Sequence, residues 1–225
     1  METNIGSTVD VFFSKYTKLV YKKGETILRA EEPPAGVMYL KRGYVRQFVV
    51  SETGEILVLH VFKPGSFFPM MWVLNSEHNR FYYEAIIATE IWRAPKDDVL
   101  KFLKDNPDVF VHFTKRLMTG VNGLLQRLED LILESAYIKT VLLILYYAKN
   151  FGIKHDSHLV LDVPLTHKEV ASWIGTTRET ASLQMESLKK KGLVVYEGRT
   201  LIIPNTDRLE REIESFVPKG KSASN

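Results

Sequence analysis

Residues 165–192 read LTHKEVASWIGTTRETASLQMESLKKKG, and this stretch decides the fold of the C-terminal part of the chain. Thr166 and Glu169 have the spacing of a capping box, in which a threonine caps the start of a helix and the following glutamate bonds back to it. Glycine is typical of a helix end, so the pattern predicts a helix that begins after Thr166 and stops at Gly175.

A second helix is expected directly after the first. Thr176 and Thr177 predict its cap, and the pattern predicts a helix from Arg178 to about Lys191 that ends at Gly192. Two short helices with a glycine turn between them form a helix-turn-helix. The side chains expected on the inside of this unit are Ala171, Ile174, Ala181, Met185 and Leu188.

A hairpin is expected after the second helix. The apolar run 193–196, the turn at Glu197-Gly198 and the run 200–203 have the pattern of two short paired strands. A helix-turn-helix followed by a hairpin is a winged helix. A last helix is expected over about 206–217, and the small polar residues 218–225 are expected to form a flexible tail.

A long helix is expected over residues 108–135, before the winged helix. Its apolar side chains recur at gaps of three and four residues, which is close to the repeat of a coiled coil. This periodicity favours a dimer seam, and the alternative is a helix that packs on the chain's own N-terminal domain. The seam residues would be Leu117, Val121, Leu124, Leu128 and Leu131. Residues 136–150 read as a buried helix and 151–162 as a loop.

The first part of the chain, to about residue 94, has the pattern of short strands separated by turns. Runs rich in β-branched and aromatic residues, such as 45–50 and 56–62, alternate with glycine-containing turns. Many short strands at this spacing predict an antiparallel barrel or jelly roll. A short helix is expected over 97–104. The expected domains are a β domain (1–107), the long helix (108–135), the winged-helix domain (136–217) and the tail (218–225).

Composition excludes several classes of protein and of site. The chain of 225 residues contains no cysteine, so iron–sulfur clusters, thiolate zinc sites and disulfides are excluded. No apolar run reaches the length of a membrane span, and the polar start lacks the pattern of a signal peptide. We therefore expect a cytoplasmic protein without a membrane partner. The net charge of +3 is compatible with nucleic-acid binding.

The stretch 165–182 resembles the DNA-binding signature of the Crp/Fnr superfamily, the regulators of the cyclic-AMP receptor protein and fumarate-nitrate reductase type. The caps, the glycine turn and the triplet 178–180 fall in register with that signature, and the likeness extends over about residues 12–203. The resemblance implies an α+β fold with an N-terminal cyclic-nucleotide-binding-type β-roll (jelly roll), a long dimerisation helix and a C-terminal winged helix. It also implies a homodimeric transcription regulator, not an enzyme, that binds double-stranded DNA and contacts RNA polymerase if it is an activator.

The start of the second helix carries the candidate base-reading residues. Arg178 can donate two hydrogen bonds to a guanine and Glu179 can accept one from a cytosine, whereas the alternative is an ordinary solvated helix start. Known family members have a second arginine five positions after the first. Here Leu183 stands at that place with Ser182 beside it, so the operator is expected to differ there, because leucine contacts a thymine methyl group rather than a guanine edge.

Other polar residues of this region are candidates for the DNA backbone. Hydroxyl groups and N–H groups at helix starts bind phosphate, and so do basic side chains. For the two basic residues, Lys168 and Arg199, an ordinary surface position is an equal alternative. The expected backbone contacts are Thr166, Lys168, Thr177, Thr180 and Arg199. The lysines at 189–191 are expected to complement the helix dipole instead.

The candidate sensing segment departs from the family pattern. Cyclic-nucleotide binders of this type have a Gly-Glu pair and then an Arg-Ser or Arg-Thr pair. Here Pro69-Met70 stands at the first place, and Arg80 fits the second only with a shift of one residue. Cyclic AMP is therefore not expected as the effector. The aromatic and sulfur-containing side chains form either the core of the roll, which is favoured, or an apolar effector pocket. The candidate pocket residues are Phe67, Phe68, Met70, Met71, Arg80, Tyr82, Leu124 and Leu125.

Other functions fit parts of the pattern less well. A jelly-roll enzyme of the cupin type needs two histidines and a carboxylate on neighbouring strands, but His60 and His78 stand in no such motif. A winged helix that binds a protein is disfavoured by Arg178. His155 and His158 have no third ligand, so no metal site is expected. An effector-independent regulator remains an alternative, and the effector (haem included), the operator and the direction of regulation are left open.

Overall fold

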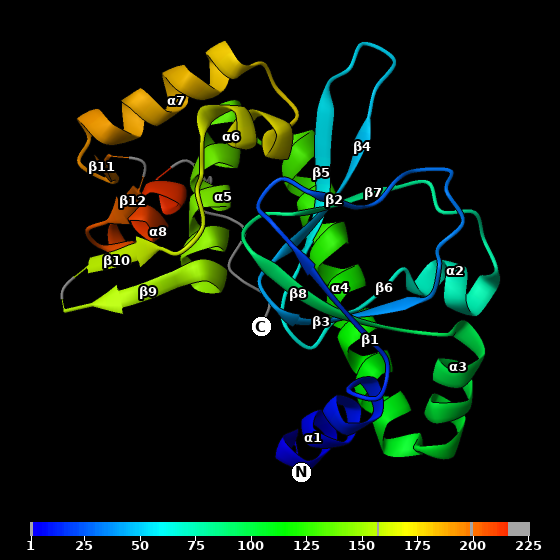
Figure 1. Ribbon diagram of the computed structural model, residues 1–225. Coiled ribbons are helices and arrows are strands. Elements are labelled where there is room, and N and C mark those ends of the chain that lie inside the picture. Colours follow the sequence, from blue (N-terminus) through cyan, green and yellow to red (C-terminus); the bar gives the residue numbers. More distant parts are fainter. Residues whose placement is uncertain (1, 157, 199, 216–225) are drawn as a thin grey trace. The chain divides into compact units, whose positions relative to one another are not determined.

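The computed structural model describes residues 2–156, 158–198 and 200–215 (Figure 1). The chain forms two compact units, Met1–Leu125 and Gln126–Asn225, and the division falls within the long helix α4 (Pro107–Leu133). Each unit has its own buried core, so each is described by itself.

Unit 1 contains two antiparallel four-stranded sheets with the strand orders β1-β8-β3-β6 and β2-β7-β4-β5. One buried cluster takes side chains from both sheets, including Leu40 of β3, Phe68 of β6 and Tyr83 of β7, so the sheets face each other across this core. The jelly-roll prediction is therefore confirmed. The strands are β1 (Thr17–Tyr21), β2 (Thr26–Leu28), β3 (Val37–Arg42), β4 (Val45–Val50), β5 (Ile56–Phe62), β6 (Phe67–Phe68), β7 (Tyr82–Ala85) and β8 (Thr89–Ala94).

The tight turns of unit 1 need glycine for steric reasons. Gly43, between β3 and β4, has φ +87, and a Cβ atom there would lie 2.4 Å from the hydroxyl of Thr89 and 2.7 Å from the carbonyl of Ala88. No side chain fits at that distance, so glycine lets the turn between β3 and β4 lie against the start of β8.

A second cluster in unit 1 joins the helices to the outer side of one sheet. It contains Phe13 of α1 (Glu2–Phe13), Met70 of α2 (Met70–Asn75), Phe102 of α3 (Lys96–Asp105) and Phe113 of α4. The sequence predicted α3 and α4 but not α1 or α2. The ring of Phe12 stacks on Phe102 at 4.1 Å between centroids, so α1 is held by a partner ninety residues away in the sequence.

Unit 2 contains helices around a small antiparallel sheet of strand order β11-β12-β10-β9. The buried helix α5 (Ala136–Phe151), the helix-turn-helix pair and the hairpin β11–β12 agree with the sequence prediction. The elements after α5 are β9 (Gly152–His155), β10 (His158–Leu161), α6 (His167–Ile174), α7 (Arg178–Lys190), β11 (Val195–Glu197), β12 (Thr200–Ile203) and α8 (Thr206–Glu214).

The loop predicted over 151–162 is wrong. Residues 152–155 and 158–161 form the paired strands β9 and β10, and β10 also pairs with β12, with Leu159 opposite Ile203. The strands are too short to be recognised alone, and the partner that stabilises them lies forty residues further on. His155 and His158 therefore face each other across a hairpin, with their ring centroids 5.9 Å apart.

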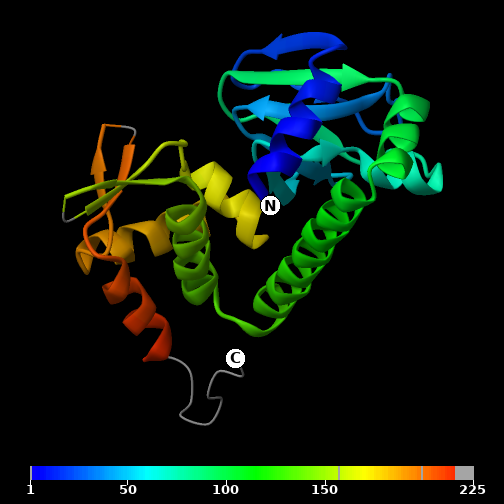
Figure 2. The ribbon, with the colours of Figure 1, turned by 90° about the horizontal axis from the view of Figure 1, so that it is seen from below.

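Among the described helices, none is both long and apolar enough to span a membrane. Figure 2 shows that α4 is one unbroken helix, and it contains 27 residues. The expected tail, 218–225, lies outside the described residues, as do the last two residues of the predicted final helix.

Candidate nucleic-acid interface

The start of α6 has the capping box that the sequence predicted. The backbone N–H of Thr166 donates to Glu169 Oε2 at 2.6 Å, and the N–H of Glu169 donates to Thr166 Oγ1 at 3.2 Å. At the other end, Gly175 adopts the left-handed conformation (φ 64) and its N–H donates to the carbonyl of Ala171. Both ends of α6 are therefore defined by local bonds, and the chain enters α7 after a short turn.

We predict that Thr166→Ala lowers the free energy of unfolding by about 1 kcal/mol, because the N–H of Glu169 loses its acceptor. Thr166→Ser keeps the hydroxyl oxygen and should cost much less. The measurement is urea unfolding of the DNA-free protein, followed by far-ultraviolet circular dichroism. Equal destabilisation by alanine and serine would contradict a capping role.

Helix α7 begins with its own cap. Thr177 Oγ1 accepts from the backbone N–H of Thr180 at 3.2 Å, and the two hydroxyl groups lie 3.1 Å apart. Arg178 and Glu179 follow in the first turn, and both side chains are exposed. Within the part of the chain that the structure describes, Arg178 has no ion-pair partner, so its guanidinium group is available at the positive end of the helix dipole.

The two faces of α7 have different surroundings. Ala181, Met185 and Leu188 are at most 1% exposed and pack against the rest of unit 2. The residues Arg178, Glu179, Ser182 and Leu183 lie together on the other face, because they are spaced by one helical turn. Leu183 is 69% exposed, so its side chain is accessible to a ligand. All four candidate base-reading residues are therefore brought together on one accessible surface.

The remaining backbone candidates are placed around the start of this surface. Thr166 and Lys168 are exposed at the beginning of α6, Thr177 caps α7, and Thr180 lies in the first turn of α7. Arg199 lies outside the described residues, between β11 and β12. The hairpin itself is tied to the helix-turn-helix, since the hydroxyl of Tyr196 donates to the carbonyl of Leu165 at 3.3 Å. Burial raises the pKa of Tyr196 to about 12, so this donor keeps its proton at neutral pH.

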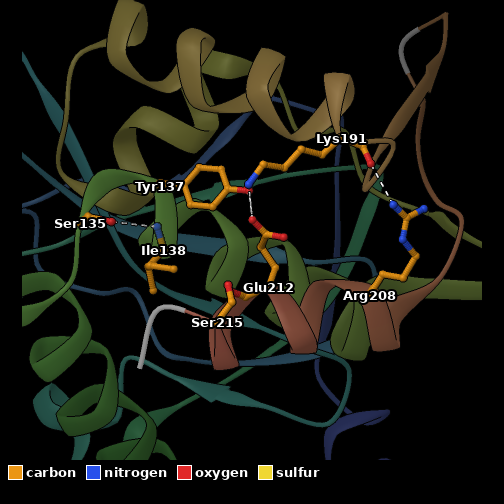
Figure 3. Close-up of polar contacts among 7 residues, drawn as sticks. All are labelled: Ser135, Tyr137, Ile138, Lys191, Arg208, Glu212 and Ser215. Atoms are coloured by element: carbon orange, nitrogen blue, oxygen red, sulfur yellow. Dashed lines mark hydrogen bonds and ion pairs between the residues drawn. The ribbon is translucent and has the colours of Figure 1, made fainter. Parts of the chain in front are cut away.

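The far end of α7 is held by α8 (Figure 3). Arg208 donates from Nη2 to the carbonyl of Lys191 at 2.9 Å, and Lys191 forms an ion pair with Glu212. The hydroxyl of Tyr137, in the first turn of α5, donates to the same Glu212 carboxylate at 2.7 Å. Lys191, the C-cap of α7, thus also pairs with α8, a contact that the sequence did not predict. Its hydrogen bond to Glu212 raises the pKa of Lys191 and lowers the pKa of Glu212.

The candidate effector residues have different surroundings in the described chain. Phe68 belongs to the core between the sheets, and Phe67 and Met70 pack in the cluster with the helices. Met71 and Arg80 are exposed. The ring of Tyr82 stacks on Phe48 at 5.3 Å. Leu124 and Leu125 are exposed on α4.

A different cavity lies at the junction of α2, α3 and α4, and the sequence did not indicate it. Its volume is about 310 Å³, and apolar side chains make up nearly all of its lining. The lining residues are Leu74, Leu100, Leu103, Lys104, Pro107 and Phe110. These residues come from three separate helices, and one of these helices was not expected, so no sequence signal could have grouped them. Among the described residues, no group of three or more histidine and carboxylate side chains could hold a metal ion.

The predicted dimer seam runs along an exposed side of α4. Val121 and Leu124 are each 46% exposed and Leu128 is 54% exposed, whereas Leu117 and Leu131 are partly buried. A Cβ atom built on Gly120 or Gly123 would meet nothing within 4 Å. Beyond Phe113, no residue of α4 in the described chain is fully buried, so this helix keeps an apolar surface that its own chain does not cover.

Comparison with known proteins agrees with both units. Residues 18–106 match the family model of the cyclic nucleotide-binding domain, and residues 126–212 match that of the Crp-like helix-turn-helix domain. The chain is 23% identical over 194 residues to the global nitrogen regulator of a Nostoc species, covering 85% of this chain and 87% of the relative. It is 22% identical over 205 residues to the cAMP-activated global transcriptional regulator of Pasteurella multocida, covering 90% and 97%.

Solved structures show the same fold. A transcriptional regulator of the CRP/FNR family from Thermus thermophilus superposes with a TM-score of 0.74 at 20% identity, covering 88% of this chain and 98% of that one. The c-di-GMP-responsive global regulator of Xanthomonas campestris superposes with a TM-score of 0.77 at 19% identity, covering 89% and 99%. The Pasteurella relative is named as activated by cAMP and the Xanthomonas protein as responsive to c-di-GMP, so the likeness in fold does not define an effector.

Proposed function

Because this chain belongs to the Crp/Fnr family of DNA-binding transcription regulators, we propose that it binds a two-fold symmetric operator as a homodimer and reads each half-site with α7 in the major groove. The family consists of transcription regulators and not enzymes, which removes the cupin-type alternative. The observation that carries the proposal is the accessible face of α7, where Arg178, Glu179 and Leu183 stand opposite a fully buried face.

Each residue of this face has a distinct partner in the groove. The guanidinium of Arg178 donates to guanine O6 and N7, and the carboxylate of Glu179 accepts from a cytosine N4 amino group. Leu183 packs against a thymine methyl group, and Ser182 bonds to either base type. Arg178 has no ion-pair partner among the described residues, and this supports the assignment. An arginine already paired with a carboxylate would have to break that pair before it could bind a guanine.

The phosphate contacts surround the reading face. The helix starts at Thr166 and Thr177 present free N–H groups to an anion, and Lys168 supplies a positive charge beside them. Arg199, which lies outside the described residues, stays a candidate from the sequence for a further backbone contact. These contacts position α7 and carry no sequence information.

The uncovered apolar side of α4 supports the homodimer. In a symmetric dimer the same seam, Leu117 to Leu131, would pack against its copy and bury the exposed leucines. The described chain offers no other cover for these side chains. A regulator of this type acts on DNA in the cytoplasm, and it contacts RNA polymerase if it is an activator.

We predict that cyclic AMP does not bind with high affinity. The residue at the place of the ribose-binding glutamate is Met70, and its side chain is buried in the core with α1 and α3. Arg80 is exposed and could serve a phosphate only with a shift of one residue, and the motif supplies no carboxylate for the ribose hydroxyl. Calorimetry with millimolar cyclic AMP should show no saturable heat. Tight binding that is lost in Arg80→Ala would show that the cassette functions despite its sequence.

Selection of bound sequences from a randomised DNA library tests the proposed function. We expect a palindromic motif whose half-sites lie about one helical turn apart, because two reading helices must enter successive major grooves on one face. A non-palindromic motif, or the absence of any motif, would contradict homodimeric reading.

A further inference from the structure

Arg127, near the C-terminal end of α4, is bound to the first helix of the helix-turn-helix. Its guanidinium carbon lies 4.2 Å from the ring centroid of Trp173, and its Nη2 donates to the carbonyl of Trp173 at 2.7 Å. Both residues belong to unit 2. One arginine thus makes a cation–π contact and a charge-assisted hydrogen bond to the same residue.

This carbonyl lies at the end of α6, where helix carbonyls lack partners within the helix. The N–H groups of Gly175 and Thr176 both donate to the carbonyl of Ala171. The carbonyl of Trp173 accepts from Arg127 instead. A cation at this position also meets the negative end of the α6 dipole. Arg127 therefore completes the end of α6, immediately before the turn that leads into the reading helix.

The contact is supported by an aromatic cluster on α5. The ring of Trp173 lies 5.3 Å from Tyr146 and 5.8 Å from Tyr147 between centroids. Burial beneath these rings lowers the pKa of Arg127 to about 10, so the side chain remains charged at neutral pH. A charge held in such surroundings is costly to leave without its partner.

The contact also bridges the joint between α4 and the helices that follow. Helix α4 ends at Leu133, and α5 begins at Ala136 with Ser135 as its cap, which accepts from the N–H of Ile138 at 3.3 Å. The torsions of the two connecting residues, 134 and 135, therefore set how the helix-turn-helix is oriented on α4. The bond from Arg127 to Trp173 adds a second attachment on the far side of that connection.

We propose that Arg127 is a positioning residue, which locks the helix-turn-helix onto the end of α4 so that the two reading helices of the dimer keep a fixed separation. The proposal rests on homodimeric reading of a two-fold operator through α4. Without the lock, the helix-turn-helix pivots about residues 134–135. Each helix-turn-helix of the dimer then reads its half-site as before, but the separation of the two reading helices is no longer preset. Ordering the two helix-turn-helices on binding DNA then costs affinity.

Operators with different spacing between the half-sites test the proposal. The wild-type protein should prefer one spacing sharply. Arg127→Ala should bind the operator with the preferred spacing about tenfold more weakly than the wild type does. It should lose less affinity for operators with other spacings, and it should keep the wild-type affinity for an isolated half-site. Gln126→Ala, the exposed neighbour on α4, is the matched control and should behave as the wild type. Arg127→Lys keeps the charge but not the planar fork, so it should show the same flattening to a smaller degree.

Thermal unfolding establishes whether each variant is folded. If Arg127→Ala does not fold, the spacing preference of Arg127→Lys is compared with that of the wild type instead. If the Arg127 variants prefer one spacing as sharply as the wild type does, the proposed role of Arg127 is overturned and the proposed function remains. An equal loss on every operator and on the isolated half-site would also overturn that role, because Arg127 would then support only the fold of unit 2. A wild-type protein with no spacing preference would overturn homodimeric reading itself, and the lock with it.

Discussion

Arg178→Ala is expected to weaken binding to the operator by about 2–6 kcal/mol and to remove the preference for one base pair in each half-site. A bidentate arginine–guanine contact contributes about 1–3 kcal/mol of discrimination. In a symmetric dimer the contact is made twice, so the loss doubles and appears in both half-sites. The exposed position of Arg178 in the first turn of α7, beyond the cap at Thr177, means that the substitution leaves the fold of the helix unchanged.

The measurement is binding to a randomised operator library at two salt concentrations. Lys168→Ala is the matched control, because a lost phosphate contact weakens every DNA sequence alike and lowers the salt slope by about one unit per contact. Arg178→Ala should instead change the base preference. If it keeps the wild-type preference at every position, Glu179, Ser182 or Leu183 carries the specificity.

The helix-turn-helix could be predicted from the sequence because its determinants are local. The capping box at Thr166 and Glu169, the left-handed glycine at 175 and the cap at Thr177 all act within a few residues of where they stand. The periodicity of α4 is local in the same sense, and its bounds were predicted to within about a turn. Signals of this kind need no partner elsewhere in the chain.

The elements that the sequence did not predict depend on distant partners. Strands β9 and β10 form with the help of β12, and α1 is held in place by Phe102 through the stacked ring of Phe12. The role of Lys191 likewise depends on Glu212, which lies in α8. Pairings over such distances cannot be derived from hydrophobic pattern and turn residues alone.

The candidate effector site in the N-terminal domain also could not be predicted from local sequence signals. The sequence favours a core for the aromatic run around Phe67 and Phe68 but leaves a pocket open, and only the packing separates the two. In the structure, Phe68 stacks on Tyr83 at 5.1 Å within the core between the sheets. Arg80 was identified by its alignment with a family motif, and the structure shows only that its side chain is exposed.

Leu128→Asp is expected to give a monomer and to reduce operator affinity by a factor of about 10²–10⁴, because a monomer loses the gain in affinity from linking two half-sites. Leu128 is 54% exposed in the single chain and lies in the proposed seam, where a two-fold dimer would place two carboxylates close together. Since the side chain has little contact within its own chain, the substitution should leave the monomer folded.

Met118→Asp is the matched control for this variant, since Met118 is 58% exposed on the same helix but stands outside the seam. Light scattering at micromolar concentration should give twice the chain mass of 25.9 kDa for the wild type and for Met118→Asp, and 25.9 kDa for Leu128→Asp. The charge at residue 128 acts on the interface and not on the reading face, so the monomer should keep the base preference of the wild type within a single half-site. A monomeric wild-type protein would contradict the dimer. If Met118→Asp dissociates as readily as Leu128→Asp, the interface is not confined to the proposed seam. The spacing of the apolar residues in α4 would then not define the dimer interface.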